Sequence, residues 1–251
     1  MIDSPWFVGF RPVLAPALRW FAFPHAGGAA SAFRPLSIAL PPSIELVGVQ
    51  PPGRWNRIKE APHRRVLDLV DAMFAPFVSA AAEAPFALWG HSLGALVAFE
   101  LARRLQREGK PAPRLLLVSA RRDPTLAPLG APMAHLDDEA FINAVDERYG
   151  GINPAVRADK EMMALTLPAL RADMEMYETY RASDGDKLLA PIVALRGVAD
   201  PITSEETVAG WAAQTRAGFQ ATVFSGGHFF PFDASNKATL IELLRTAELR
   251  A

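Results

Sequence analysis

Short runs of apolar residues recur along the chain, and most are followed by a loop and then by apolar positions at helical spacing. Runs of this kind, without polar alternation, are typical of strands that are covered on both faces, as in a parallel sheet. The runs lie at residues 18–23, 44–50, 86–90, 114–120, 191–197 and 221–227, and the helical patterns at 65–81, 93–108, 204–214 and 235–247. This alternation predicts an α/β fold with an open, mostly parallel, doubly wound sheet.

The longest departure from this rhythm lies between about residues 121 and 186, where helical patterns occur without a strand-like run. An all-helical insertion in an α/β domain is most simply a lid over the carboxyl ends of the strands. We therefore interpret residues 1–251 as a single domain with a helical lid insertion at about 121–186. A separate helical subdomain without a gating role is the alternative.

The insertion contains two helical patterns. Residues 135–151 predict a helix that begins at Asp137 or Asp138 and ends at two glycines. Residues 157–183 predict a pair of helices that breaks near Pro168, because proline ends or kinks a helix.

Composition excludes several classes of protein. The chain has 251 residues, of which 50% are apolar, a formal net charge of −1, and no cysteine. It therefore has no disulfide, thiolate metal site or cysteine nucleophile, and its charge does not suggest a nucleic-acid partner. The N-terminus lacks a basic segment followed by an uninterrupted apolar one, and no apolar run reaches the roughly 20 residues of a membrane span. We expect a cytoplasmic protein.

The sequence GHSLG, residues 90–94, places Ser92 between two glycines where a strand is predicted to end and a helix to begin. A nucleophile elbow has this arrangement, in which a strained serine projects its hydroxyl above the sheet. Gly90 and Gly94 lack side chains because backbone must pass close to them. The amide of Leu93, at the helix N-terminus, would point at a developing oxyanion. A turn serine without a catalytic role is the alternative.

A nucleophilic serine needs a base, and His228 is the predicted one. It follows the last strand-like run, and the two glycines before it allow a tight loop that reaches back over the sheet. A packed loop histidine is the alternative. His91 is expected to point away from the serine, and His63 and His135 lie in polar segments where solvated histidines are expected.

The acid of a triad is expected at a strand end between the serine and the histidine. Asp200 follows the run at 191–197 and precedes a proline, which favours a fixed turn. Asp123, after the run at 114–120, is the rival, although it could instead cap a lid hinge. Acidic residues of the insertion, such as Asp173, are expected to be surface charges.

The sequence FPHAGG, residues 23–28, follows the first clear strand. Small residues with free amides at this point can supply a second oxyanion donor, as the HGGG-type loop does in esterases. Either Ala26 or Gly27 would donate. An ordinary glycine turn is the alternative.

Taken together, FPHAGG, PPGR at 51–54, GHSLGALVAFELARRL, LRADMEMYETY and GGHFF resemble the type II, stand-alone editing thioesterases of polyketide and nonribosomal peptide synthetases. The resemblance extends from about residue 18 to 232. It implies an α/β-hydrolase core with a helical lid, no cofactor and no metal. It also implies removal of stalled acyl groups from the phosphopantetheine arm of an acyl or peptidyl carrier protein.

The resemblance assigns roles to five residues of this chain. Ser92, Asp200 and His228 would be the catalytic triad, and the amides of Ala26 and Leu93 would form the oxyanion hole. Two departures concern the surroundings of the site. The chain has PPGRW where the family usually has LPGRE, and RGVADP where an acidic residue or glycine pair is often found.

The sequence therefore predicts a serine hydrolase that acts on acyl thioesters, including acyl-CoA. Three alternatives are a general carboxylesterase or lipase on the same scaffold, a releasing domain of a synthetase, and a non-catalytic binding protein with a hydrolase fold.

Two further patterns bear on the acyl group and the partner. In the insertion, an apolar stripe at helical spacing predicts a wall of the acyl pocket, or else ordinary core: Leu170, Met174, Tyr177 and Arg181. Between residues 53 and 65, a basic cluster predicts docking of an acidic carrier protein, or else a solvated loop: Arg54, Arg57, Lys59, Arg64 and Arg65.

Overall fold

A seven-stranded sheet organises the computed structural model, which describes residues 4–152, 154–183 and 185–246. The strand order is β1-β3-β2-β4-β5-β6-β7, with β1 antiparallel to β3 and all other neighbours parallel. The strands are β1 (Phe7–Gly9), β2 (Leu18–Phe23), β3 (Ile44–Val49), β4 (Phe86–His91), β5 (Leu116–Ser119), β6 (Ile192–Gly197) and β7 (Phe219–Phe224). The predicted mostly parallel sheet is confirmed.

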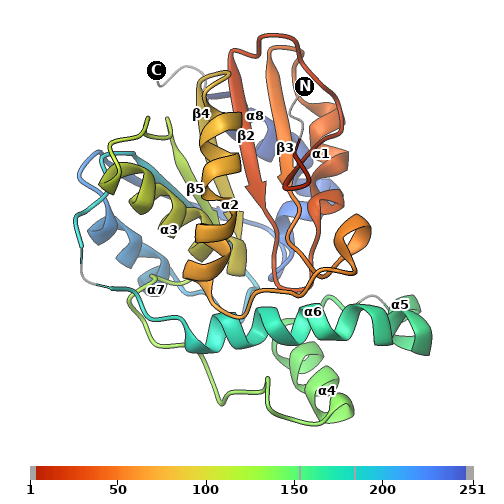
Figure 1. Ribbon diagram of the computed structural model, residues 1–251. Coiled ribbons are helices and arrows are strands. Elements are labelled where there is room, and N and C mark those ends of the chain that lie inside the picture. The colour runs from red at the N-terminus through yellow and green to blue at the C-terminus, as the bar shows by residue number, and fades with distance from the viewer. Residues whose placement is uncertain (1–3, 153, 184, 247–251) are drawn as a thin grey trace.

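Helices cover both faces of the sheet. They are α1 (Arg34–Ala39), α2 (Val66–Ala81), α3 (Leu93–Arg107), α4 (Asp138–Tyr149), α5 (Pro154–Ala158), α6 (Lys160–Thr179), α7 (Glu205–Ala209) and α8 (Lys237–Thr246). Helices α2 and α3 pack on one face, and α1 and α8 pack on the other (Figure 1). The fold is therefore the three-layer, doubly wound arrangement that the alternating pattern predicts.

Burial on both faces explains why the strand sequences are nearly continuous apolar runs. All residues of β2, β3 and β4 are buried. Successive side chains of a strand point to opposite faces, so Phe21 belongs to the core beneath α2 and α3, whereas Trp20 belongs to the core beneath α1 and α8. Two charged residues of these strands, Arg19 and Glu45, are also buried. They form an ion pair, in which Arg19 Nε donates to Glu45 Oε2 at 2.6 Å.

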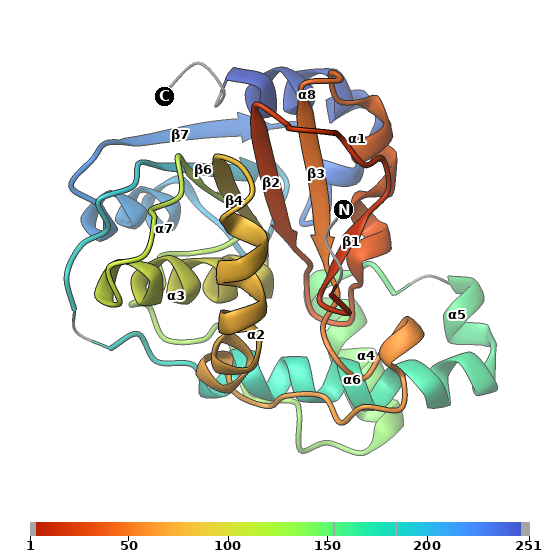
Figure 2. The same ribbon diagram turned by 45° about the horizontal axis from the view of Figure 1, so that its top comes forward.

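The helices between β5 and β6 lie across the end of the sheet to which the parallel strands point, at the bottom of Figures 1 and 2. Helix α4 begins where the sequence predicts, because the Asp137 side chain accepts a hydrogen bond from the Ala140 amide at 2.9 Å. It ends at Gly150, which has a positive φ of 63°.

One prediction for this region is wrong. Helix α6 runs without a break from Lys160 to Thr179, and Pro168 lies inside it. Proline removes one backbone hydrogen bond, but side chains on both sides of it are buried against the rest of the protein, among them Leu167, Ala169 and Ala172. Tertiary packing outweighs the local cost.

Strand β1 and helices α1 and α5 were not predicted, because segments of three to six residues are too short for a periodic pattern to be recognised. Among the described residues, no helix has the length and apolar character needed to cross a bilayer.

Candidate active site

Ser92 lies in the sharp turn between β4 and α3, with φ 55° and ψ −116°. Two glycines make this turn possible. A Cβ on Gly90 would lie 2.3 Å from the Gly94 carbonyl oxygen, and a Cβ on Gly94 would lie 2.2 Å from the carbonyl oxygen of Phe23. The strained serine is therefore held at the carboxyl end of the central strand, as a nucleophile elbow requires.

Two loops from other strands bring an imidazole and a carboxylate to this serine. His228, in the loop after β7, has Nε2 at 3.0 Å from Ser92 Oγ. Its Nδ1 lies 3.1 Å and 3.2 Å from the two carboxylate oxygens of Asp200, in the loop after β6. A carboxylate only accepts hydrogen bonds, so Nδ1 carries the proton and Nε2 is left to accept the Ser92 hydroxyl proton.

Asp200 is held as a carboxylate by its surroundings. Burial alone would raise the Asp200 pKa, but the hydrogen bond and charge of His228 and the donors Ile202 and Thr203 outweigh it and lower that pKa. Asp123 does not share this position. Its Oδ1 accepts hydrogen bonds from Thr125 and from Gln214, at 2.9 Å and 3.3 Å respectively.

Three backbone amides were candidates for an oxyanion hole. The Gly27 amide donates to Asp173 Oδ2 at 2.7 Å. Among the described residues, no acceptor faces the Ala26 amide. The Leu93 amide is at the first position of α3, where it has no acceptor within the helix. The structure therefore leaves Ala26 and Leu93 free and removes Gly27 from the candidates.

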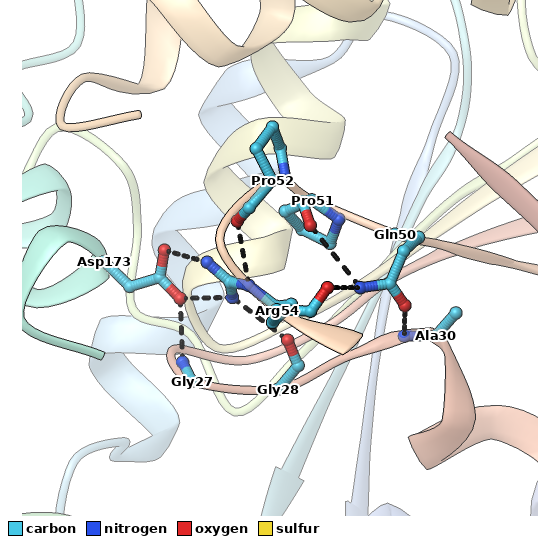
Figure 3. Close-up of polar contacts among 8 residues, drawn as sticks. All are labelled: Gly27, Gly28, Ala30, Gln50, Pro51, Pro52, Arg54 and Asp173. Atoms are coloured by element: carbon cyan, nitrogen blue, oxygen red, sulfur yellow. Dashed lines mark hydrogen bonds and ion pairs between the residues drawn. The ribbon is translucent and has the colours of Figure 1, made fainter. Parts of the chain in front are cut away.

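An ion pair across three segments fixes the Ala26 loop (Figure 3). Arg54 Nη1 and Nη2 donate to the two carboxylate oxygens of Asp173 at 2.6 Å and 3.0 Å, and Nη1 also donates to the Gly28 carbonyl at 3.0 Å. Both side chains are buried. Bidentate geometry of this kind fixes orientation as well as distance. Helix α6, the PPGR segment and the loop at 24–28 are thus tied together at one point.

Both members of this pair differ from the sequence-based predictions, which are wrong here. Asp173 is not a surface charge, and Arg54 is not free to dock a partner. A signal was present for Asp173, because it lies three residues after Leu170 and four before Tyr177, on the apolar side of the helix. An acid in an apolar stripe indicates a buried partner.

A cavity of about 230 Å³ opens at Ser92 and His228. Its walls come largely from α4, α6 and the segment between them, with Val145, Tyr149, Met163, Leu170, Met174 and Tyr177 among them. The predicted apolar stripe of α6 thus lines the cavity at Leu170, Met174 and Tyr177. Arg181 lies beyond the end of α6 and is not part of the lining.

Among the described residues, none of the remaining histidines forms a hydrogen bond with the Ser92 hydroxyl. His91 points away, as expected, with Nδ1 at 3.0 Å from Ser119 Oγ. Burial lowers the pKa of His25 to about 4, with smaller contributions from the charges of His228 and Arg54, so His25 is neutral near pH 7. His135 is exposed and His63 is half-buried.

Comparison with known proteins shows the family of this chain. A family model described as "Thioesterase domain" matches residues 19–247. The chain belongs to the thioesterase family. It is therefore an enzyme that hydrolyses thioesters, and the resemblance noted in the sequence is confirmed.

Relatives of this thioesterase include proteins that are named for biosynthetic pathways. Thioesterase PikA5 of Streptomyces venezuelae is 40% identical over 230 residues, which are 91% of this chain and 81% of that protein. The probable cadicidin biosynthesis thioesterase of Streptomyces griseus is 38% identical over 90% of this chain, and the chain spans 61% of its length. BorB, a type II thioesterase from the borrelidin biosynthetic cluster, matches in structure with a TM-score of 0.85 and 34% identity, over 99% of this chain and 98% of BorB.

The basic cluster of this thioesterase is smaller than its sequence suggests. Arg57 is buried, donates to Glu60 at 2.6 Å and lies 4.0 Å from the Trp6 ring. Arg64 pairs with Glu175 of α6 at 2.5 Å. Lys59 and Arg65 are exposed and form no ion pair with another described residue.

We expect Asp173→Asn to lower the free energy of unfolding by about 3–5 kcal/mol, because it leaves the Arg54 guanidinium buried without a counter-charge. Urea unfolding of the purified protein measures this. Glu175→Gln is a matched control two residues along α6. Its carboxylate pairs with Arg64 near the surface, so the loss is expected to be below about 1 kcal/mol. Equal losses in the free energy of unfolding of the two variants would contradict the role of Asp173 as the counter-charge of a buried Arg54.

Proposed function

We propose that this thioesterase hydrolyses acyl groups from the phosphopantetheine arms of carrier proteins, with Ser92 as nucleophile, His228 as base and Asp200 as acid. One observation carries the proposal: Ser92 Oγ, the His228 ring and the Asp200 carboxylate form a continuous hydrogen-bonded chain, with 3.0 Å and 3.1 Å contacts. This chain opens into the cavity that Leu93 and Ala26 also line.

The geometry supports an acyl-enzyme mechanism. As Ser92 Oγ attacks the thioester carbonyl, His228 Nε2 takes its proton, and the Asp200 carboxylate stabilises the resulting imidazolium. Collapse of the tetrahedral intermediate breaks the carbon–sulfur bond, and His228 returns the proton to the leaving thiolate. Water then attacks the ester carbonyl while His228 removes its proton. Collapse of the second tetrahedral intermediate breaks the bond to Ser92 Oγ, His228 returns the proton to that oxygen, and the acyl group leaves as a carboxylic acid.

The negative charge that develops on the carbonyl oxygen needs fixed donors. We assign this role to the Ala26 and Leu93 amides. Asp173 accepts a hydrogen bond from the neighbouring Gly27 amide and Arg54 donates to the Gly28 carbonyl, so the loop is fixed at the two residues that directly follow Ala26. Donors that do not reorganise during reaction stabilise the transition state most.

We also propose that α4, α5 and α6 act as the lid of a single domain. These helices supply most of the walls around the acyl cavity, and they lie over the carboxyl ends of the strands (Figure 2). Because Asp173 ties α6 to the Ala26 loop, closure of the lid and formation of the oxyanion hole depend on the same contacts.

A second groove beside the acyl cavity supports a substrate presented on a long arm. The two cavities share His25, Gly27 and Thr166. The groove is lined by exposed apolar side chains, including Trp55, which is 66% exposed, and Leu165, which is 54% exposed. An extended pantetheine chain that enters here would reach the carbonyl site from the surface.

The test compares one acyl group presented as carrier-bound thioester, as acyl-CoA and as an oxygen ester. We expect kcat/KM to be highest for the carrier-bound form, by roughly tenfold or more over acyl-CoA, through a lower KM. Faster hydrolysis of the oxygen ester would indicate a general carboxylesterase. Equal kcat/KM for carrier and CoA forms would contradict recognition of the carrier.

Reversal of the charge at the exposed basic positions, Lys59→Glu with Arg65→Glu, is expected to raise KM for an acyl-carrier substrate severalfold and to leave kcat unchanged. An acidic carrier would meet these side chains during encounter, and salt would screen the effect. Steady-state kinetics at two ionic strengths measure it. Arg107→Glu with Lys110→Glu is the matched control, because these exposed residues lie at and just beyond the end of α3 that is far from Ser92. Similar losses on a small acyl thioester would mean that the cluster supports the fold instead.

A further inference from the structure

The acyl cavity contains a buried cation without a counter-ion. Arg121 follows β5, is 5% exposed and lines the cavity beside Ser92. No carboxylate among the described residues forms an ion pair with it, and its Nε has no hydrogen-bond acceptor there. The guanidinium instead lies over the Tyr177 ring, with Cζ 4.6 Å from the ring centroid. Stacking on a ring attracts the charge but does not satisfy its N–H donors.

A second polar group in the same cavity is also unsatisfied. The Tyr149 hydroxyl is buried and has no hydrogen-bond partner among the described residues. The Tyr149 ring lies 6.5 Å from the Tyr177 ring and 5.4 Å from the His228 ring, between centroids. Both unsatisfied groups therefore lie near Tyr177, and the Tyr149 ring lies next to the base of the proposed triad.

Unsatisfied polar groups are costly in an interior that is otherwise apolar. Burial lowers the pKa of Arg121 and raises that of Tyr149, which shows how strongly this region is desolvated. Both groups can donate hydrogen bonds, and a guanidinium cannot accept one. A ligand that completes this part of the cavity must therefore supply an acceptor oxygen, and a negative charge would also balance the cation.

We propose that Arg121 and Tyr149 form a subsite that selects acyl groups carrying an acceptor oxygen beyond the thioester carbonyl, with a carboxylate preferred over a ketone. This inference rests on the proposed function, because it takes the cavity at Ser92 as the acyl site. The distal oxygen of the acyl group accepts a hydrogen bond from Arg121, and so supplies the acceptor that the protein itself does not provide. An acyl group of equal size with methyl groups only would leave both donors buried and unpaired.

The test uses three pantetheine thioesters of nearly equal shape: malonyl, 3-oxobutanoyl and 3-methylbutanoyl. We expect the wild-type enzyme to prefer the two oxygenated groups, with malonyl first. Arg121→Met keeps an apolar stem over Tyr177 and removes the donors. It should lower kcat/KM for malonyl by about 10- to 100-fold and leave 3-methylbutanoyl within about threefold. Arg121→Lys should retain part of the malonyl preference, since it keeps the charge.

Arg122→Met is the matched control, because Arg122 is half-exposed and donates to the Ala127 carbonyl outside the cavity. Tyr149→Phe removes one oxygen only and keeps the test available if Arg121→Met does not fold. It should reduce the preference for 3-oxobutanoyl over 3-methylbutanoyl. Thermal unfolding of each variant separates loss of structure from loss of selectivity.

Two results would overturn the subsite: a wild-type enzyme that hydrolyses the three thioesters equally or prefers 3-methylbutanoyl, or variants that lose activity on all three in equal proportion. The proposed function fails in a different way, namely if hydrolysis survives Ser92→Ala. Serine-dependent hydrolysis without acyl preference would overturn the subsite alone.

Discussion

Ser92→Ala is expected to reduce kcat for thioester hydrolysis by on the order of 10⁴- to 10⁶-fold, with KM little changed. Among the described residues, the Ser92 hydroxyl forms a single side-chain hydrogen bond, to His228 Nε2 at 3.0 Å. Its removal should therefore leave the turn and the core intact. The variant should also lose covalent labelling by a fluorophosphonate, which reacts with an activated serine and reports on the nucleophile without a substrate.

Ser79→Ala provides the control for this variant, because Ser79 is an exposed serine of α2. We expect it to keep full activity and labelling. An unfolding midpoint like that of the wild type would show that Ser92→Ala is folded. Near-normal turnover by a folded Ser92→Ala enzyme would mean that Ser92 only forms a turn, and the mechanism would have to be abandoned.

Asp200→Asn is expected to reduce kcat by on the order of 10⁴-fold, as in the serine-protease triad. In the wild type, Asp200 accepts hydrogen bonds from the Ile202 amide at 3.0 Å and from the Thr203 hydroxyl at 2.9 Å. The Ile202 donor is fixed, so the asparagine oxygen should stay there, whereas the Thr203 hydroxyl can rotate to accept. The new NH₂ then takes the Oδ2 position, which lies 3.2 Å from His228 Nδ1. A donor there repels a proton on Nδ1 and favours one on Nε2, and a protonated Nε2 cannot accept from the serine.

The pH dependence of this variant follows from the lowered pKa of Asp200. At every pH above that value the wild-type group is a carboxylate, so the loss in kcat should be uniform across the working range. A group whose pKa is lowered by folding adds stability above its unfolded pKa and loses it as the pH falls through its folded pKa. The stability advantage of the wild type over Asp200→Asn should therefore shrink in acid.

Asp123→Asn is the matched control, since it also alters a buried carboxylate at a strand end, but one that bonds Thr125 and Gln214. We expect its kcat to stay within about tenfold of the wild type. Rates against pH and urea unfolding of both variants make the comparison. A larger loss in kcat for Asp123→Asn than for Asp200→Asn would show that the acid is assigned wrongly.

Patterns within one segment were enough to predict the elbow and the sheet around it. Continuous apolar runs identified the parallel strands because each is buried on both faces. The glycines beside Ser92 were informative because a Cβ at either position would lie within about 2.3 Å of backbone. The candidate positions of His228 and Asp200 followed from strand order, and the structure brings both to Ser92.

Contacts between distant segments of the chain could not be predicted from such local patterns. Arg54 and Asp173 are 119 residues apart, and each alone resembles a solvated charge. Pro168 looked like a helix break, because its local cost is visible in the sequence and the packing that overcomes it is not. Arg121 Nε is buried without a hydrogen-bond acceptor, and this depends on which acceptor atoms of distant segments lie near it in the fold.

The sequence by itself determined the order of the longer strands and helices, the turn at Ser92 and the loops that could carry its partners, because these depend on local backbone sterics and on burial patterns of fixed period. Only the tertiary structure decided which amide remains free for an oxyanion, which charges are buried in pairs, and which polar groups face the acyl cavity unsatisfied. These depend on distances and on desolvation, which are set jointly by segments that have no neighbour relation in the chain.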